Sequence, residues 1–124
     1  MEKYLVIGLG GFLGANARYL IGNWAAQRWG TAFPFGTLLI NATGSFILGL
    51  FLGATTERFL IDPRWRLFFA VGFLGAYTTF STYTYESIQL VLNGSWGPGL
   101  ANLLASNALG LTASVLGIIS GRNL

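Results

Sequence analysis

A run of hydroxyl, aromatic and glycine residues, GFLGAYTTFSTYTYE at positions 72–86, interrupts an otherwise apolar part of the chain. Within a membrane, non-helical backbone is tolerated only where it is buried in protein or lines a wet cavity. A helix that breaks here would turn free carbonyl and amide groups toward a bound ion, as the discontinuous helices of transporters do. The alternative is a continuous helix whose Ser and Thr hydroxyls bond to its own carbonyls or join neighbouring helices. The residues alone leave both interpretations open.

Three single polar or charged residues stand out in the apolar segments. Asn41 carries a buried amide that must find partners, so it serves either packing or ligand binding, and the sequence favours packing. Arg18 lies about five residues from the end of its apolar segment, roughly 8 Å at 1.5 Å per residue. It can snorkel to the membrane surface or concentrate anions in a wet vestibule. Glu86 can likewise snorkel or end a polar track.

A narrow stripe of polar or small residues repeats every four positions near the C-terminus: Asn102, Ser106, Gly110 and Ser114. Residues at this spacing share one face of a helix, so the stripe serves either helix packing or the lining of a pore. Glycines four positions apart favour close helix packing, and three pairs occur: Gly10/Gly14, Gly49/Gly53 and Gly117/Gly121. A chain this short has little room for an internal pore, so we expect a compact bundle that forms an oligomer.

The composition excludes most enzyme chemistry. Cysteine and histidine are both absent, which removes disulfides, thiolate nucleophiles and zinc-finger patterns as well as the commonest general base and metal ligand. Of the four acidic residues, only Glu86 lies in an apolar stretch. The seven basic residues are scattered without interleaved aromatics. We therefore expect neither an enzyme nor a nucleic-acid-binding protein.

The composition instead predicts an all-α membrane protein. Hydrophobic residues make up 53% and charged residues 9% of the 124 residues, whereas soluble domains carry roughly 25% charged residues. A membrane-spanning helix needs roughly 20 mostly apolar residues, and four segments fit: 4–24, 36–54, 67–92 and 98–120. We expect these spans to form one domain, 1–124. The apolar character resumes after Arg18, so the first segment is expected to be a span rather than a cleaved signal peptide.

Lysine and arginine positions predict the orientation of the four spans, because cytoplasmic loops carry an excess of these residues. The N-terminus, the second loop and the C-terminus share one side and hold five of them: Lys3, Arg58, Arg64, Arg66 and Arg122. The opposite side holds Arg28, and Arg18 lies nearer to it. This bias favours a cytoplasmic N-terminus.

Three motifs together resemble the small fluoride channel family called Fluc or CrcB. They are GGFLGANARY at 10–19, PFGTLLINATGSF at 34–46 and GFLGAYTTFST at 72–82, in the family's order and at its spacing. The resemblance implies four transmembrane helices with the third broken near its middle, and a dual-topology homodimer of antiparallel subunits in the inner (plasma) membrane. It also implies two separate fluoride pathways per dimer, each lined by both chains, and a central structural sodium ion.

The resemblance assigns roles to single residues. Asn41 matches the family's pore asparagine and Phe80 the first phenylalanine of its aromatic box. Tyr83 stands where a second phenylalanine is usual; its ring edge can still face an anion, but its hydroxyl can change selectivity or rate. The polar track beside the box is matched by Thr37, Ser81, Thr82 and Glu86. Ser106 matches the hydroxyl of the fourth span, and Arg18 matches the vestibule arginine. The backbone carbonyls of the sodium site are matched by Gly75 and Thr78.

The implied function, passive export of fluoride from the cytoplasm, agrees with the chemistry of these residues. Fluoride is small and strongly hydrated, so a pore must replace its water by close hydrogen-bond donors, and Asn41 offers two N–H groups. Phenylalanine ring edges carry the positive part of the quadrupole and can face an anion without holding it tightly. Conduction requires sites that an ion can also leave.

Two other functions are alternatives. A small four-helix, proton-coupled multidrug transporter needs a carboxylate in its first span, but that span holds Arg18 and no acid. A non-conducting structural membrane subunit would use every polar residue for packing. The five-to-two distribution of basic residues also leaves open whether the chain pairs with itself or with an oppositely inserted paralogue.

Overall fold

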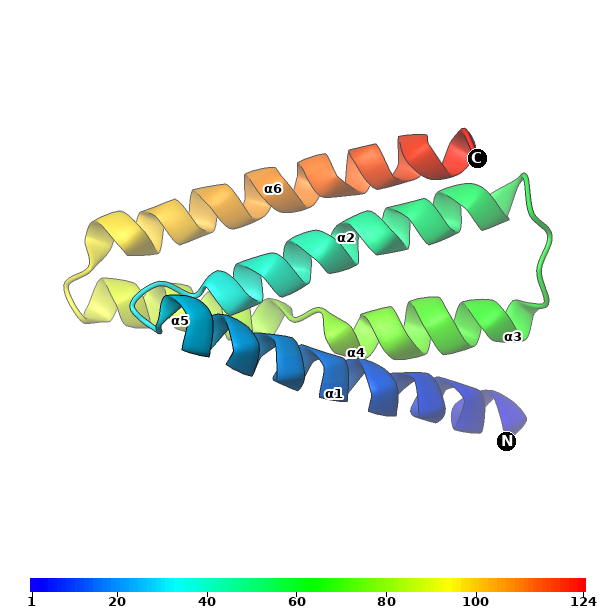
Figure 1. Ribbon diagram of the computed structural model, residues 1–124, viewed down its shortest axis with the longest axis horizontal. Coiled ribbons are helices and arrows are strands. Elements are labelled where there is room, and N and C mark those ends of the chain that lie inside the picture. Colours follow the sequence, from blue (N-terminus) through cyan, green and yellow to red (C-terminus); the bar gives the residue numbers. More distant parts are fainter.

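The computed structural model describes all 124 residues, and they form helices without strands. The helices in chain order are α1 (Glu2–Trp29), α2 (Phe35–Thr56), α3 (Pro63–Trp65), the π-helix η1 (Arg66–Leu74), α4 (Gly75–Tyr77), α5 (Phe80–Leu92) and α6 (Trp96–Arg122). Figure 1 shows α1, α2 and α6 as three long rods, while α3, η1, α4 and α5 follow one another along a fourth. The predicted all-α architecture is confirmed.

Three of the four predicted spans are single helices that are long and apolar enough to cross a membrane: Glu2–Trp29, Phe35–Thr56 and Trp96–Arg122. Each extends past its predicted limits, because helical hydrogen bonding continues into the polar residues that flank the apolar stretch. The remaining rod, predicted as 67–92, is interrupted at Thr78 and Thr79, where the backbone is extended with ψ of 156° and 123°. The structure therefore favours a broken helix over a continuous one in this segment (Figure 1).

Glycines bring the helix backbones into contact at the predicted pairs. A Cβ on Gly14 would collide with the carbonyl oxygen of Phe73 in η1, and a Cβ on Gly10 would collide with that of Phe68. Helices α2 and α6 approach each other in the same way at the two further pairs, Gly49/Gly53 and Gly117/Gly121. The packing interpretation of these glycines is confirmed.

Replacing Gly14 with alanine is expected to destabilise the folded chain, because the new methyl group would push α1 away from the η1 backbone. Overpacking of this kind costs about 1–3 kcal/mol and should lower the thermal-unfolding midpoint of the purified protein. Gly8 is the matched control on the same helix, since a Cβ there would meet nothing within 4 Å. Gly8→Ala should leave the midpoint unchanged or raise it. Equal losses in the two variants would contradict the close contact assigned to Gly14.

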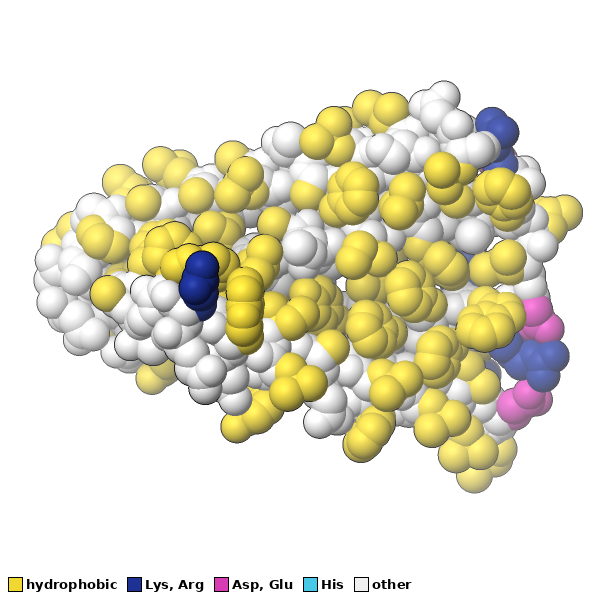
Figure 2. All heavy atoms as spheres, viewed as in Figure 1, with side chains coloured by type: hydrophobic (Ala, Val, Ile, Leu, Met, Phe, Trp, Pro, Cys, Tyr) yellow, Lys and Arg dark blue, Asp and Glu magenta, His cyan; other side chains and the backbone are white.

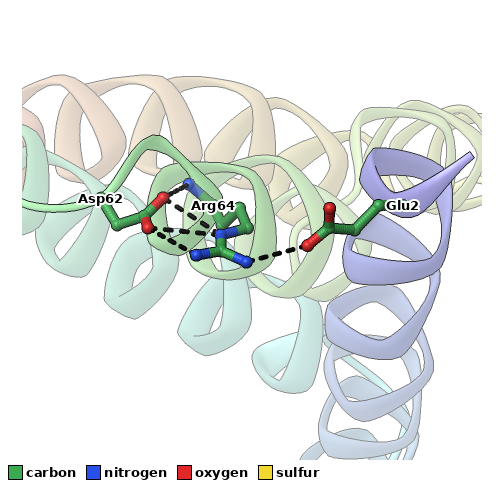
Figure 3. A network of polar contacts seen from close by, with 3 residues as sticks. All are labelled: Glu2, Asp62 and Arg64. Carbon is green, nitrogen blue, oxygen red and sulfur yellow. Dashed lines mark hydrogen bonds and ion pairs between the residues drawn. The ribbon is translucent and has the colours of Figure 1, made fainter.

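Charged side chains gather at the end of the bundle where both chain termini lie (Figure 1, Figure 2). There, Arg64 forms ion pairs with Glu2 at 2.9 Å and with Asp62 at 2.8 Å (Figure 3). Asp62 also caps α3 by accepting the Arg64 backbone N–H at 2.9 Å, and these contacts lower the pKa of Asp62 to about 2. The network ties the start of α1 to the loop after α2. The predicted sharing of one side by both termini and this loop is thus confirmed, whereas its cytoplasmic location stays a prediction.

Candidate functional site

The interruption between α4 and α5 is shaped by the hydroxyl group of Thr79. Its Oγ1 accepts the backbone N–H of Thr82 at 3.2 Å, which is how a threonine side chain caps a helix N-terminus. It also donates to Thr82 Oγ1 at 3.1 Å. The N-terminus of α5 is therefore capped by Thr79, one of the residues in the hydroxyl-rich run.

Asn41 of α2 holds the extended backbone at this interruption. Its Nδ2 donates to the Thr79 carbonyl and its Oδ1 accepts the Thr79 N–H, both at 2.9 Å. This N–H would bond to the Gly75 carbonyl in a continuous helix, so the amide replaces a bond that the break removes. An asparagine has two N–H donors, and the second one has no protein partner. The position of Asn41 is compatible with both packing and ligand contact.

The break removes the helical donors of the carbonyls from Gly75 to Thr78, and two of these carbonyls belong to the residues matched to the sodium site. In an unbroken helix the Gly75 carbonyl would accept from Thr79, whose N–H bonds to Asn41 instead. The Thr78 carbonyl would accept from Thr82, whose N–H bonds to the Thr79 hydroxyl. Hard cations take oxygen ligands. The two residues matched to the sodium site therefore offer the chemistry that such an ion needs.

Helix α2 also holds the residues just before the break. The Thr43 and Tyr77 hydroxyl oxygens lie 2.9 Å apart, and the Tyr77 ring stacks on Phe73 with 5.9 Å between centroids. A Cβ on Gly44 would collide with the Thr78 methyl group, so only glycine lets α2 lie this close to the end of α4. The position of the break is therefore set by contacts between α2 and the third rod.

A cavity of about 630 Å³, termed the wide cavity, opens between α1, the start of α2, and α5. Five of its lining residues come from the polar residues discussed above: Arg18, Thr37, Thr79, Thr82 and Glu86. Arg18 Nε donates to the Ala76 carbonyl at 3.1 Å, near the negative C-terminal end of the helix that precedes the break. Glu86 has a buried Oε1 without a hydrogen-bond partner. The two charged groups share the cavity without forming an ion pair.

A second cavity of about 250 Å³, termed the small cavity, lies beside the break. Its lining includes four predicted pathway or sodium-site residues: Asn41, Thr78, Phe80 and Tyr83. Thr79 lines both cavities, which therefore adjoin at this residue. The Phe80 and Tyr83 ring centroids are 5.9 Å apart, and their exposed fractions are 77% and 7%. No charged side chain lines the small cavity.

The remaining predicted site residues line neither cavity: Gly75, Ser81 and Ser106. Ser81 is exposed beside the helix cap. The Ser106 hydroxyl donates to Asn102 Oδ1 at 3.0 Å, and Asn102 Nδ2 donates to the Ser87 hydroxyl at 2.8 Å. Asn102 and Ser87 are both fully buried. This part of the polar stripe therefore packs α6 against α5. Of the two roles considered for the stripe, helix packing and pore lining, the structure favours packing here.

Two residues of the site were not identified from the sequence. Thr79 caps α5, is held by Asn41 and lines both cavities, but a run of neighbouring hydroxyls gives no basis for choosing one of them. Asn107 of α6 donates through Nδ2 to the Tyr83 hydroxyl oxygen at 2.7 Å. An amide in the middle of an apolar segment is the signal that could have identified Asn107.

Comparison with known proteins identifies close relatives over nearly the whole chain. A family model described as "CrcB-like protein, Camphor Resistance (CrcB)" matches residues 5–118. A "Fluoride-specific ion channel FluC" of Koribacter versatilis (strain Ellin345) is 56% identical over 117 residues, which cover 94% of this chain and 92% of the relative. Its namesake from Sulfurihydrogenibium sp. (strain YO3AOP1) is 46% identical over 124 residues, the full length of both chains. A third, from Acidobacterium capsulatum, is 45% identical over 122 residues, or 98% of each chain.

Proposed function

This chain belongs to the CrcB-like protein family, whose model spans residues 5–118, and from that premise we propose that it is a passive, fluoride-selective ion channel. Relatives that cover nearly the whole chain bear the name fluoride-specific ion channel. The direction of transport in this proposal is export from the cytoplasm across the inner (plasma) membrane. No step of it requires an enzyme active site.

The observation that carries this function is the uncharged, donor-rich lining of the two cavities where they adjoin at Thr79. Asn41, which has one N–H without a protein partner, lines the small cavity, and Thr37 and Thr82 line the wide one. Such groups donate to an anion and replace the water that fluoride loses. A full positive charge at the narrow point would hold the ion too tightly, and the small cavity has none. The ion can therefore enter and also leave.

The aromatic pair and the charged pair have separate roles in this proposal. Phe80 and Tyr83 present ring edges, the positive part of their quadrupoles, to the ion. Arg18 raises the anion concentration in the wide cavity, where it stays close to water. Glu86 and the exposed hydroxyl of Ser81 extend the polar track, whereas the Ser106 hydroxyl is bound to Asn102 at the contact between α5 and α6.

The assembly in this proposal is a dimer of two antiparallel copies. Phe80 is 77% exposed, and the polar backbone beside it lies at a depth where lipid would leave its groups unsatisfied. A second copy inserted in the opposite direction would cover this face and give each of two pathways a lining from both chains. An oppositely inserted paralogue is the alternative partner, given the five-to-two distribution of basic residues.

The freed carbonyls of Gly75 and Thr78 support a structural sodium ion between the two copies. Thr78→Val is expected to leave sodium binding and fluoride flux close to normal. Only the carbonyl is proposed as a ligand, and the Thr78 hydroxyl bonds to the Leu74 carbonyl at 2.9 Å. That carbonyl keeps the Thr78 N–H at 3.1 Å as a partner, so the loss is limited to about 1 kcal/mol. Fluoride efflux and the sodium content of the purified protein measure both effects. A large loss of flux with sodium still bound would assign the role to the hydroxyl instead.

Fluoride efflux from liposomes that contain the purified protein tests the proposed function. With a potassium ionophore present, fluoride release is expected to follow the membrane potential and to be independent of a proton gradient, while chloride is retained. Release that requires a proton gradient would instead indicate a coupled transporter. Liposomes as tight as protein-free ones would indicate a non-conducting membrane subunit.

A further inference from the structure

The hydroxyl group of Tyr83 reaches across to α6. It accepts a hydrogen bond from Asn107 Nδ2 at 2.7 Å and donates a long one to the Leu103 carbonyl oxygen at 3.4 Å. The Tyr83 residue is only 7% exposed, and its ring lines the small cavity beside Phe80. The hydroxyl end of the side chain is thus held by a neighbouring helix while the ring stays at the cavity.

Both N–H groups of the Asn107 amide are used in hydrogen bonds within the protein. It lies in the middle of α6 (Trp96–Arg122), at a depth where an amide must find partners within the protein. One Nδ2 hydrogen is directed to Tyr83 and the other to the Leu103 carbonyl at 2.8 Å. Both donors of Asn107 are therefore used, and neither is available to an anion.

We propose that Asn107 is a positioning residue of the fluoride pathway, which holds the Tyr83 hydroxyl against α6 so that only the ring faces the ion. The proposal rests on the proposed function as a fluoride channel. It accounts for a tyrosine at the second position of the aromatic pair, because the hydroxyl finds its partner outside the small cavity. Without Asn107, the hydroxyl keeps only the 3.4 Å bond that it donates to the Leu103 carbonyl, which is too long to hold it in place. The O–H then turns toward the small cavity and exchanges this weak acceptor for fluoride, and a more tightly held ion leaves more slowly.

The backbone of Tyr83 is held independently of Asn107. The Ser87 hydroxyl donates to the Tyr83 carbonyl at 2.8 Å and accepts from Asn102 at 2.8 Å. Ser87 and Asn102 are fully buried and join α5 to α6. Removal of the Asn107 amide should therefore release the end of one side chain without moving the helix.

A double-mutant cycle tests this proposal in the full-length protein. Fluoride and chloride efflux are measured for the wild type, Asn107→Leu, Tyr83→Phe and the double variant, all in liposomes of the same lipid. Asn107→Leu is expected to slow fluoride efflux about tenfold, the rate equivalent of one hydrogen bond. In the Tyr83→Phe background, the added Asn107→Leu change should alter efflux by less than about twofold, because no hydroxyl remains to be held. Asn123→Leu at the C-cap of α6 is the control, since that amide bonds only to the Ile119 carbonyl of α6 at 2.7 Å.

The outcomes separate this proposal from the function on which it rests. A wild type that releases no fluoride overturns the proposed function itself. A conducting wild type in which Asn107→Leu slows efflux equally with and without the Tyr83 hydroxyl gives Asn107 a purely structural role and overturns the proposal. An Asn107→Leu variant with wild-type flux overturns it as well. Restoration of flux by Tyr83→Phe in the Asn107→Leu background supports it.

Discussion

Replacement of Asn41 by leucine is expected to reduce fluoride efflux by about a hundredfold or more, the rate equivalent of roughly 2.7 kcal/mol. Leucine has a similar volume but no polar atoms, so the Thr79 N–H and carbonyl both lose partners that lie 2.9 Å away. Each buried polar group left without a partner costs about 1–3 kcal/mol. The pathway also loses the free N–H that would donate to the ion. Both effects act at the residue where the two cavities adjoin.

The matched control is Asn16→Leu on α1. Its amide is exposed and bonds only to the Phe12 carbonyl of its own helix at 2.7 Å, so its removal should leave efflux within about twofold of the wild type. Liposome efflux measures the rates, and size-exclusion chromatography in detergent reports whether each variant keeps its assembly. Should Asn41→Leu not fold, Asn41→Asp offers a second test. It can still accept the Thr79 N–H, but it places a negative charge beside a carbonyl and an anion. Normal fluoride flux in a folded Asn41 variant would contradict the role assigned to this amide.

Composition and spacing predicted most of the fold because a membrane imposes strong constraints. Four apolar segments in a chain with 9% charged residues leave few arrangements other than a helical bundle. The glycine pairs predicted close packing correctly, because the absence of a Cβ has one main consequence between helices. The limits of the segments were less accurate, because helices α1, α2 and α6 continue into polar residues that a hydropathy pattern excludes.

The break at Thr78 and Thr79 could be proposed from the sequence but not established. A run of hydroxyls suits both a continuous helix and a broken one, since each hydroxyl can bond to either kind of backbone. The decision comes from Asn41, which lies far away in the sequence and reaches the Thr79 N–H and carbonyl across the bundle. Tertiary contacts of this kind are not encoded in a local pattern.

The candidate site was predicted in part, for a related reason. Three of the predicted pathway residues, Asn41, Phe80 and Tyr83, line the same cavity, and their role in fluoride conduction stays a prediction. The stripe of Asn102 and Ser106 could equally have lined a pore, and only the buried contact with Ser87 shows that it packs. The nine-residue π-helix η1 is a further obstacle, because i→i+5 bonding changes which side chains share a face.

Phe80→Ile is expected to abolish measurable fluoride efflux, which means a reduction of about a hundredfold or more. The fold of the subunit should stay intact. The ring is 77% exposed in the single chain, so it contributes little to the packing of its own subunit. Isoleucine keeps the apolar character but has no quadrupole, and the ion loses the positive ring edge that would replace part of its hydration. The variant therefore separates the chemistry of the pathway from the stability of the helix.

Phe12→Ile provides the comparison that this argument requires. Phe12 is also largely exposed, at 67%, but it lies on α1 and lines neither cavity. Its replacement should leave efflux unchanged, since the residue lines neither cavity and isoleucine is also apolar. Efflux from liposomes, thermal-unfolding midpoints and the chromatographic size of the assembly are measured for both variants. Wild-type efflux in both variants, with both assemblies intact, would remove the aromatic pair from the pathway. It would leave the amide and hydroxyl groups around Thr79 as the only groups in contact with the ion.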